Sequence, residues 1–221
     1  MSATAEVYVP GGAVLPEGEH AADRFAEAFA LLIALAPPPA EVASLDPPPS
    51  WAAWNHAEAG LWPRPDYEDI DLSAVAGSEW IDQAGRCARD RLRAPYASKA
   101  VIGHCDWLAG NLRWSGDELL VVHDWDSTAA EGEAVLVGFA AALFSSVSPD
   151  ERATVAETES FLDAHSNARD RAFSSDELRQ SWAAGVWTRA HDAKCQHAAG
   201  QPVVSLAEDE AGERLRRAGI G

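Results

Sequence analysis

The sequence is poor in basic residues and in cysteine, and both shortages limit what the protein can do. Its 221 residues include 17 Lys and Arg against 35 Asp and Glu, which gives a formal net charge of −18. A protein that binds nucleic acid neutralises phosphates with basic side chains, so this balance argues against a nucleic-acid partner. The three cysteines, Cys87, Cys105 and Cys195, form no CxxC pair. They indicate neither a disulfide framework nor a zinc cluster, and they favour a cytoplasmic location.

Long apolar runs are missing as well. The longest ones cover residues 28–36 and 135–144, whereas a helix that crosses a bilayer needs about 20 apolar residues. The N-terminus also has no basic stretch of the kind that begins a secretory signal. We therefore expect neither membrane insertion nor secretion.

Helical periodicity dominates the patterns that the sequence does contain. Apolar residues recur every three to four positions in several segments. Ser78, Ser148 and Ser174 are predicted N-caps, with Pro149 at a first helical position and Glu177 completing a capping box. We predict helices over residues 20–35, 78–94, 133–147, 149–168 and 174–197, and a charged terminal helix over 208–221 that frays.

Short strands are predicted between these helices. Residues 6–9 form a strand pattern before a turn, and residues 101–103 are a short apolar segment. Residues 112–114 and 119–122 are predicted to pair as a hairpin, because Ser-Gly-Asp between them is typical of a turn. The predicted fold class is therefore α+β, mainly α.

One long segment, residues 37–72, fits neither pattern. It is rich in Pro, Asp and Trp and shows no sustained period, so we predict an irregular course with one helical turn near residues 51–59. Long irregular segments in compact domains are often functional.

Polar residues with fixed spacing flank the predicted hairpin. His104, Asp106 and Asn111 match the pattern H-x-D-x-x-x-x-N, and Asp124 follows the second strand. This pattern is typical of a phosphotransferase catalytic loop, where a carboxylate lies beside the acceptor hydroxyl and oxygen ligands hold Mg²⁺ against the phosphates. We predict that the hairpin folds the chain back, so that Asn111 and Asp124 converge on one metal ion while Asp106 faces the acceptor.

In these residues the chain resembles the C-terminal lobe of the aminoglycoside phosphotransferase and choline kinase-like family, relatives of the protein kinases. His104-Cys105-Asp106 and Asp124-Trp125-Asp126 are similar to the H-G-D and I-D-W-x patterns of that family. The resemblance implies a protein kinase-like helical lobe over residues 20–221, with a catalytic loop over 101–128. Residues 1–19 would be a hinge- or linker-like remnant.

The resemblance also implies a role for each residue of the motif. Asp106 would be the catalytic base, and Asn111 and Asp124 would be the metal ligands. His104 would be a structural anchor of the loop, and Trp125 would be the aromatic residue that follows the metal-binding Asp. Apart from the resemblance, Asp126 is predicted to form hydrogen bonds with the backbone, with orienting the loop or binding a second metal as the alternatives.

One feature of the family is not identifiable in this sequence. The chain has two lysines, Lys99 and Lys194, and neither lies in a strand pattern of the V-A-I-K type. Residues 10–12 form a turn pattern but not a Gly-rich phosphate loop. We therefore expect a chain that lacks the nucleotide-gripping N-terminal lobe, and the residues that bind the nucleotide stay undefined.

The function implied by the resemblance is ATP- or GTP-dependent and Mg²⁺-dependent transfer of a phosphoryl group. The acceptor would be a hydroxyl of a small polar or cationic molecule. The alternative is a non-catalytic lobe that binds a small molecule or docks onto a separate nucleotide-binding chain. Either way, an apolar face left by the missing lobe is expected to be covered, for example by self-association.

Several other residues that are often functional have simpler interpretations here. Cys105 is predicted to be a small buried residue rather than a nucleophile. His123 is predicted to pack or to form hydrogen bonds. His191, Cys195 and His197 lack metal-site spacing and are predicted to be solvent-facing polar residues. The tryptophans are predicted to be mostly core, with a cation-binding face as the alternative.

Overall fold

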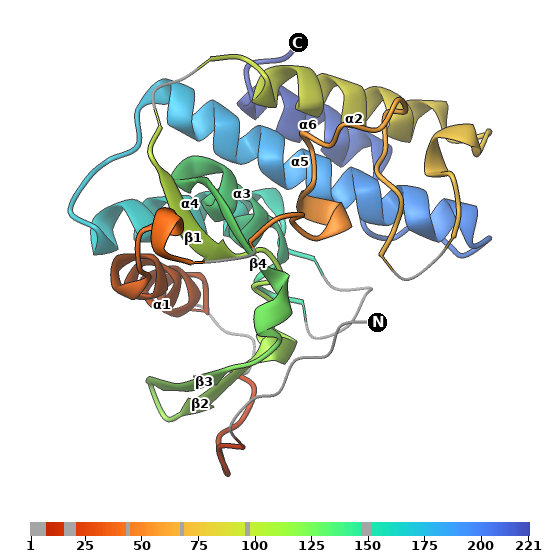
Figure 1. Ribbon diagram of the computed structural model, residues 1–221. Coiled ribbons are helices and arrows are strands. Elements are labelled where there is room, and N and C mark those ends of the chain that lie inside the picture. The colour runs from red at the N-terminus through yellow and green to blue at the C-terminus, as the bar shows by residue number, and fades with distance from the viewer. Residues whose placement is uncertain (1–7, 16–20, 43–44, 67–68, 96–97, 147–151) are drawn as a thin grey trace.

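Helices make up most of the chain that the structure describes. The computed structural model describes residues 8–15, 21–42, 45–66, 69–95, 98–146 and 152–221. In chain order the main elements are α1 (Ala21–Leu35), α2 (Glu79–Leu92), β1 (Ala100–His104), β2 (Leu112–Ser115), β3 (Glu118–Val122), β4 (Thr128–Gly132), α3 (Glu133–Leu143), α4 (Val155–Ala168), α5 (Ser175–Ala198) and α6 (Glu208–Arg217). The α+β, mainly helical class predicted from the sequence is confirmed (Figure 1).

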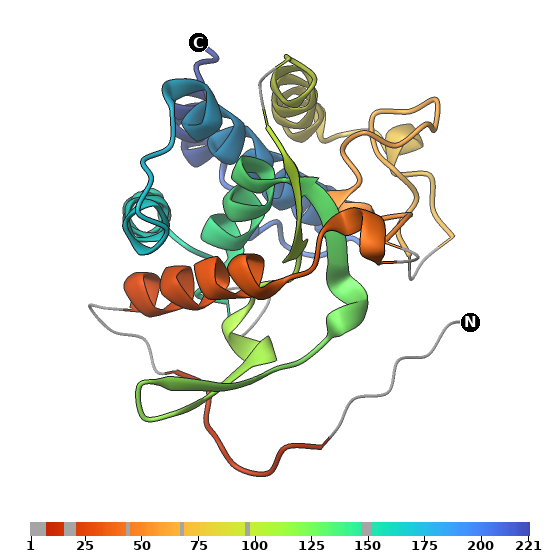
Figure 2. The ribbon, with the colours of Figure 1, turned by 60° about the vertical axis from the view of Figure 1, so that its left-hand side comes forward.

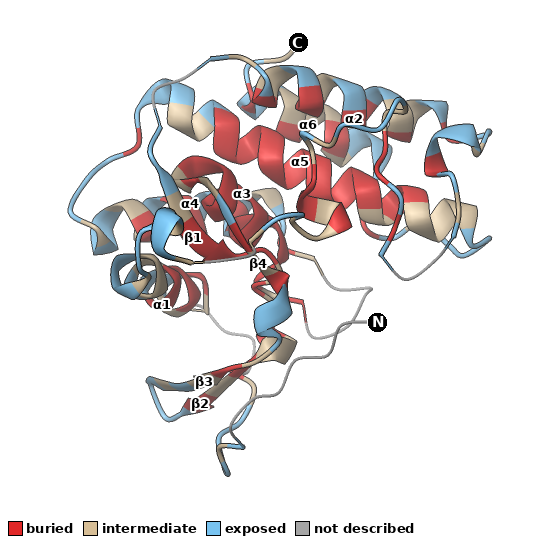
Figure 3. Ribbon diagram, in the orientation of Figure 1, coloured by how far each residue is buried: buried red, intermediate tan, exposed pale blue. Residues whose placement is uncertain are grey.

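The long helix α5 lies at the centre of the helical part. It packs against both α2 and α3, and Figure 3 shows α3 and α5 as long stretches of buried ribbon. The backbones of α3 and α5 approach closely because Gly138 of α3 has no side chain. A Cβ at that position would lie 2.1 Å from the carbonyl oxygen of Ser181 in α5. None of the helices in the described ranges combines the length and the apolarity that a membrane span needs.

Two small antiparallel sheets connect to the loop that contains the motif. β1 pairs with β4, with His104 opposite Thr128, and β2 pairs with β3 as the predicted hairpin. Figure 2 shows this hairpin extending away from the helices. The segment from His104 to Asn111 therefore leaves the end of one sheet and enters the start of the other.

The N-terminal strand prediction is wrong where the structure describes it. Residues 6 and 7 lie outside the described ranges, and Tyr8 and Val9 belong to no strand. Pairing occurs further along, where Ala13 and Trp114 exchange amide-to-carbonyl hydrogen bonds of 2.9 and 2.8 Å. The described N-terminal segment therefore joins the hairpin at a single bridge.

The long irregular segment is largely as predicted. Within its described residues it contains three short 3₁₀ turns, Pro39–Glu41, Ser50–Ala52 and Leu72–Ala74. The turn at Ser50–Ala52 replaces the longer helical turn predicted near residues 51–59.

The predicted beginning of α4 is wrong. The helix begins at Val155, and Thr154 is its N-cap. The Thr154 hydroxyl accepts from the Glu157 amide, while the Glu157 carboxylate accepts from the Thr154 amide. The predicted cap and first residue, Ser148 and Pro149, lie outside the described residues. The Thr154 capping box satisfies the free amides at this helix end.

Two other expectations about helix ends hold only in part, and in both places side chains have long-range partners. Ser78 is the N-cap residue of α2, as predicted, but its side chain forms no cap hydrogen bond, and its hydroxyl accepts from Lys194 Nζ at 2.6 Å. The terminal helix α6 does not behave as a frayed end: Arg214 is fully buried and donates to Glu210 and to the Ala153 carbonyl oxygen. Local sequence patterns do not reveal such partners.

Candidate functional site

His104 fixes the start of the motif loop. Its side chain is fully buried at the end of β1. The Asp106 amide donates to His104 Nδ1 at 3.1 Å, and His104 Nε2 lies 2.9 Å from the His123 carbonyl oxygen. Since Nδ1 accepts a hydrogen bond, Nε2 is the nitrogen that carries the proton and donates. The imidazole therefore connects the loop to the end of β3.

Asp106 and Asn111 are brought together by the same loop. Asn111 Nδ2 donates to the Asp106 carbonyl oxygen and to Asp106 Oδ2, both at 2.9 Å. The His123 amide donates to the Asn111 carbonyl oxygen at 2.9 Å. Because this bond continues the pairing of β2 with β3, the backbone of Asn111 lies beside the residue that precedes Asp124.

Asp124 has an unusual backbone. It lies just after β3 with a φ of 67° and a ψ of 46°, in the left-handed region. Non-glycine residues adopt this region rarely, although Asp does so more readily than most. The Ser127 amide donates to the Asp124 carbonyl oxygen at 3.0 Å, and the Ser127 hydroxyl lies 3.5 Å from Asp124 Oδ2. The turn leaves Asp124 exposed.

The environment of Asp106 changes its acidity. Desolvation by burial is the largest influence and raises the pKa of Asp106 to about 6, against the lowering effect of the Asn111 hydrogen bond. The negative charge of Asp124 raises it further. Groups that act as general bases often have a pKa close to the working pH. Asp106 is therefore ionised in neutral solution but can accept a proton at little cost.

Asp106 lines a small polar cavity, which we call the Asp106 pocket. Its volume is about 210 Å³, and its polar wall consists of Asp106, Arg152, Thr188 and Asp192. Trp51 from the irregular segment is also part of the lining. The sequence does not reveal that Trp51, Arg152, Thr188 and Asp192 line a cavity together with Asp106. The fact that Thr188 and Asp192 are four residues apart on one helix was the available signal, but it does not reveal what that helix face contacts.

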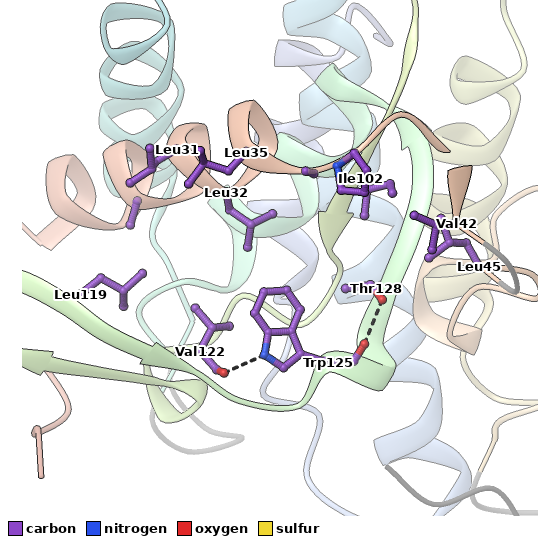
Figure 4. A pocket seen from close by; sticks show the side chains of 13 residues that line it. Leu31, Leu32, Leu35, Val42, Leu45, Ile102, Leu119, Val122, Trp125 and Thr128 are labelled. Atoms are coloured by element: carbon purple, nitrogen blue, oxygen red, sulfur yellow. Dashed lines mark hydrogen bonds between the residues drawn. The ribbon is translucent and has the colours of Figure 1, made fainter. Parts of the chain in front are cut away.

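Trp125 and Asp126 lie on the other part of the motif. Trp125 is 45% exposed, its Nε1 donates to the Val122 carbonyl oxygen at 2.9 Å, and its ring lies edge-on to His104 with centroids 5.9 Å apart. It lines a larger cavity of about 450 Å³, the Trp125 pocket, whose other walls come mainly from apolar side chains of α1, β1, β3 and the irregular segment, where Val42 and Leu45 take part (Figure 4). Asp126 is exposed.

The oxygen atoms in the motif suit a hard cation. Among the described residues, no group of three or more His, Cys, Asp or Glu side chains is placed to hold a metal ion. Mg²⁺, however, is usually held by one or two carboxylates together with water and substrate phosphates. The Asp124 carboxylate and the Asn111 amide oxygen, which points away from Asp106 because the amide nitrogen faces it, are donors of that kind. The chemistry of these donors fits Mg²⁺ with a nucleotide.

The lysines do not provide a phosphate clamp in the described part of the chain. Lys194 is fully buried in α5, and its Nζ donates to the Val75 carbonyl oxygen and to the Ser78 and Asp82 side chains at 2.6–2.9 Å. It is a structural tie between α5 and α2. Lys99 is exposed and lies just before β1.

Of the remaining residues, Cys105 is buried as predicted, whereas His191 differs from its prediction. Cys105 is fully buried, and burial raises the pKa of its thiol, so it stays protonated and is a poor nucleophile. The prediction that His191 faces solvent is wrong, because it is 1% exposed and its Nδ1 lies 3.9 Å from both Asp192 Oδ1 and Cys195 Sγ. The His191 side chain is buried because other helices surround α5 over most of its length.

Comparisons with known proteins do not place the chain in a family. No protein-family model matches it, and no curated protein matches it.

Proposed function

We propose that this chain has a protein kinase-like C-lobe and is an aminoglycoside phosphotransferase-like protein. It transfers the γ-phosphoryl group of ATP or GTP to a hydroxyl group of a small molecule. The observation that carries the proposal is the setting of Asp106. This carboxylate lines a pocket of about 210 Å³, is held by Asn111 at 2.9 Å, and has a pKa raised to about 6 by burial.

Asp106 would act on the acceptor hydroxyl. As the hydroxyl oxygen forms its bond to the γ-phosphorus, the bond from that phosphorus to the bridging oxygen breaks. The hydroxyl proton passes to Asp106, and the products are a phosphate ester and a nucleoside diphosphate. The Asn111 hydrogen bond orients the carboxylate for this transfer. His104 positions the loop through its contact with the Asp106 amide.

Asn111 and Asp124 would hold Mg²⁺. A bound Mg²⁺–nucleotide supplies the phosphoryl group and neutralises its negative charge. The two donors flank the hairpin, with Asn111 just before β2 and Asp124 just after β3, and the hydrogen bond from the His123 amide to the Asn111 carbonyl oxygen keeps these ends together. The left-handed backbone at Asp124 sets the direction of its side chain.

The test is a phosphotransfer assay with the purified chain. The γ-labelled nucleotides ATP and GTP, each with Mg²⁺, are offered with a broad panel of small hydroxyl compounds. We expect a labelled ester that wild-type protein forms and that Asp106→Asn does not form. The matched control is Asp163→Asn, which changes an exposed carboxylate on α4. Absence of any Asp106-dependent transfer across the panel would refute the proposal.

A second candidate function is a non-catalytic lobe that docks onto a separate nucleotide-binding chain. The Trp125 pocket favours it, because Leu31 and Leu35 on its rim are 57% and 75% exposed, and Trp125 is 45% exposed. Apolar surfaces of this kind mark protein interfaces. The site of the second protein would thus adjoin Asp124, where a nucleotide phosphate has to lie.

Calorimetry and sedimentation separate the two candidates. The second candidate predicts no heat when Mg²⁺–ATP or Mg²⁺–GTP is titrated into the chain, and a monomer at all concentrations. Nucleotide binding by the chain alone would argue against it. A concentration-dependent dimer that Leu35→Glu abolishes would show instead that a second copy covers the pocket.

A further inference from the structure

The Asp106 pocket contains groups that the proposed transfer step does not use. Thr188 and Asp192 are four residues apart on α5, so their side chains lie on one face of that helix. Arg152 reaches the same cavity from the segment before α4. These three residues form a polar wall in the cavity that Asp106 also lines.

The Thr188 hydroxyl lacks a partner in the described part of the chain. The residue is fully buried, yet its Oγ1 makes no hydrogen bond there. A buried hydroxyl normally has a partner, and leaving it without one is unfavourable. Thr188 is one of the residues that line the cavity, so its hydroxyl is the candidate in this wall for a hydrogen bond to a ligand.

Arg152 and Asp192 present a donor and an acceptor side by side. Arg152 Nη2 lies 3.0 Å from Asp192 Oδ2. The guanidinium group also donates to the hydroxyls of Ser146 and Ser205, at 3.2 and 3.4 Å. A guanidinium beside a carboxylate matches two neighbouring hydroxyl groups, since each hydroxyl can accept from Arg152 and donate to Asp192.

The rest of the lining is apolar. It consists of Trp51, Leu108 and Leu143. The Trp51 indole is held by a hydrogen bond from its Nε1 to the Cys105 carbonyl oxygen at 3.3 Å. A lining that combines polar groups with aromatic and aliphatic side chains suits a molecule that has both hydroxyl groups and a C–H face.

We propose that the Asp106 pocket binds a neutral polyhydroxylated molecule with two adjacent hydroxyl groups, which contact Arg152, Asp192 and Thr188. This inference rests on the phosphotransferase function proposed above, in which the ligand is the acceptor and one further hydroxyl faces Asp106. The wall does not select a cationic acceptor, because Asp192 is already paired with Arg152 at 3.0 Å. A cation at this wall would meet the guanidinium group and the carboxylate together, so their effects largely cancel and Asp106 is the carboxylate of the lining that would attract it.

Ligand-observed NMR tests this specificity directly, with the full chain and without nucleotide. The probes are pentoses, hexoses and inositols, their deoxy analogues that lack one of two adjacent hydroxyls, and choline as a cation of comparable size. We expect the intact polyols to bind, the deoxy analogues to bind about three- to tenfold more weakly, and choline not to bind.

Variants at Thr188 locate the binding. Thr188→Val removes the hydroxyl at constant volume and should weaken polyol binding about three- to tenfold, whereas Thr188→Ser keeps the hydroxyl and should bind like wild type. Asp163→Asn on α4 serves as the control, and thermal melts check that each variant is folded. The inference would be overturned by any of three results. These are polyol binding that Thr188→Val leaves unchanged, no polyol binding at all, and preferential binding of choline.

The outcomes also separate this inference from the proposed function. Asp106-dependent phosphotransfer to an acceptor without adjacent hydroxyls would overturn the inference and leave the function standing. Thr188-dependent polyol binding without any phosphotransfer would support the binding site and refute the function.

Discussion

The two pockets of the molecule differ in size, polarity and support. The Asp106 pocket has about 210 Å³ and a wall of charged and polar groups held by hydrogen bonds. The Trp125 pocket has about 450 Å³, and its walls are almost wholly apolar. The first has the properties of a site for a small polar ligand, and the second has those of a surface that another layer of protein covers. One motif segment, residues 104–125, contributes side chains to both pockets.

The largest effect is expected at the polar pocket. In the phosphotransfer assay, Asp106→Asn should lower the rate about 10²- to 10⁴-fold, the range that general-base catalysis contributes. The wild-type rate should rise with pH up to about 6 and then level, because the carboxylate must be ionised to accept the proton. A pH–rate profile checks this. A profile that falls as pH rises through 6 would contradict the assigned role.

The polar pocket should also depend on buried charges behind it. Arg189 is 3% exposed and donates to the Ser205 and Ala153 carbonyl oxygens and to Glu210. Arg189→Met leaves these acceptors buried without their donor, so we expect a loss of about 3–5 kcal/mol in the free energy of unfolding. Urea denaturation measures it.

The control for that measurement is on the same helix. Arg179→Met removes a guanidinium that is 48% exposed and pairs with Asp176 three residues away. Its effect should stay below about 0.5 kcal/mol. If Arg189→Met loses no more free energy of unfolding than Arg179→Met, the hydrogen bonds of Arg189 do not stabilise the fold.

Ionisation of Asp106 should lower the free energy of unfolding. Its folded pKa of about 6 exceeds its ordinary value of 3.8. The stabilising contribution of its neutral form is thus complete below about pH 4 and lost as pH rises to about 6. The free energy of unfolding of Asp106→Asn, measured relative to that of wild type, should therefore be about 1–3 kcal/mol higher at pH 8 than at pH 3. Denaturant titrations at the two pH values check this, and a pH-independent difference would contradict it.

The smallest effect is expected at the apolar pocket. Leu35 is 75% exposed, so Leu35→Ser should change the free energy of unfolding by less than about 0.5 kcal/mol. Leu136→Ser is the matched change at a fully buried residue of α3 and should cost about 3 kcal/mol or more. A large loss for Leu35→Ser would show that the Trp125 pocket is part of the core, and the contrast between the pockets would fail.

Several elements were predictable because their signals are local. The hairpin of β2 and β3 follows from its turn residues, and the capping box of Ser174 and Glu177 marks the beginning of α5. β4 was not predicted, since Ala129, Ala130 and Gly132 show no strand alternation and the strand exists through its pairing with β1.

The sequence by itself determined the mainly helical α+β class and the spacing of His104, Asp106, Asn111 and Asp124. These features depend on short-range periodicity and on backbone geometry within one hairpin. The tertiary structure alone decided that Asp106 shares a cavity with residues 152, 188 and 192, which are 46 or more positions away in the chain. That proximity arises from the packing of α5 against α3, and helix packing brings together side chains whose distance in sequence carries no information about their contact.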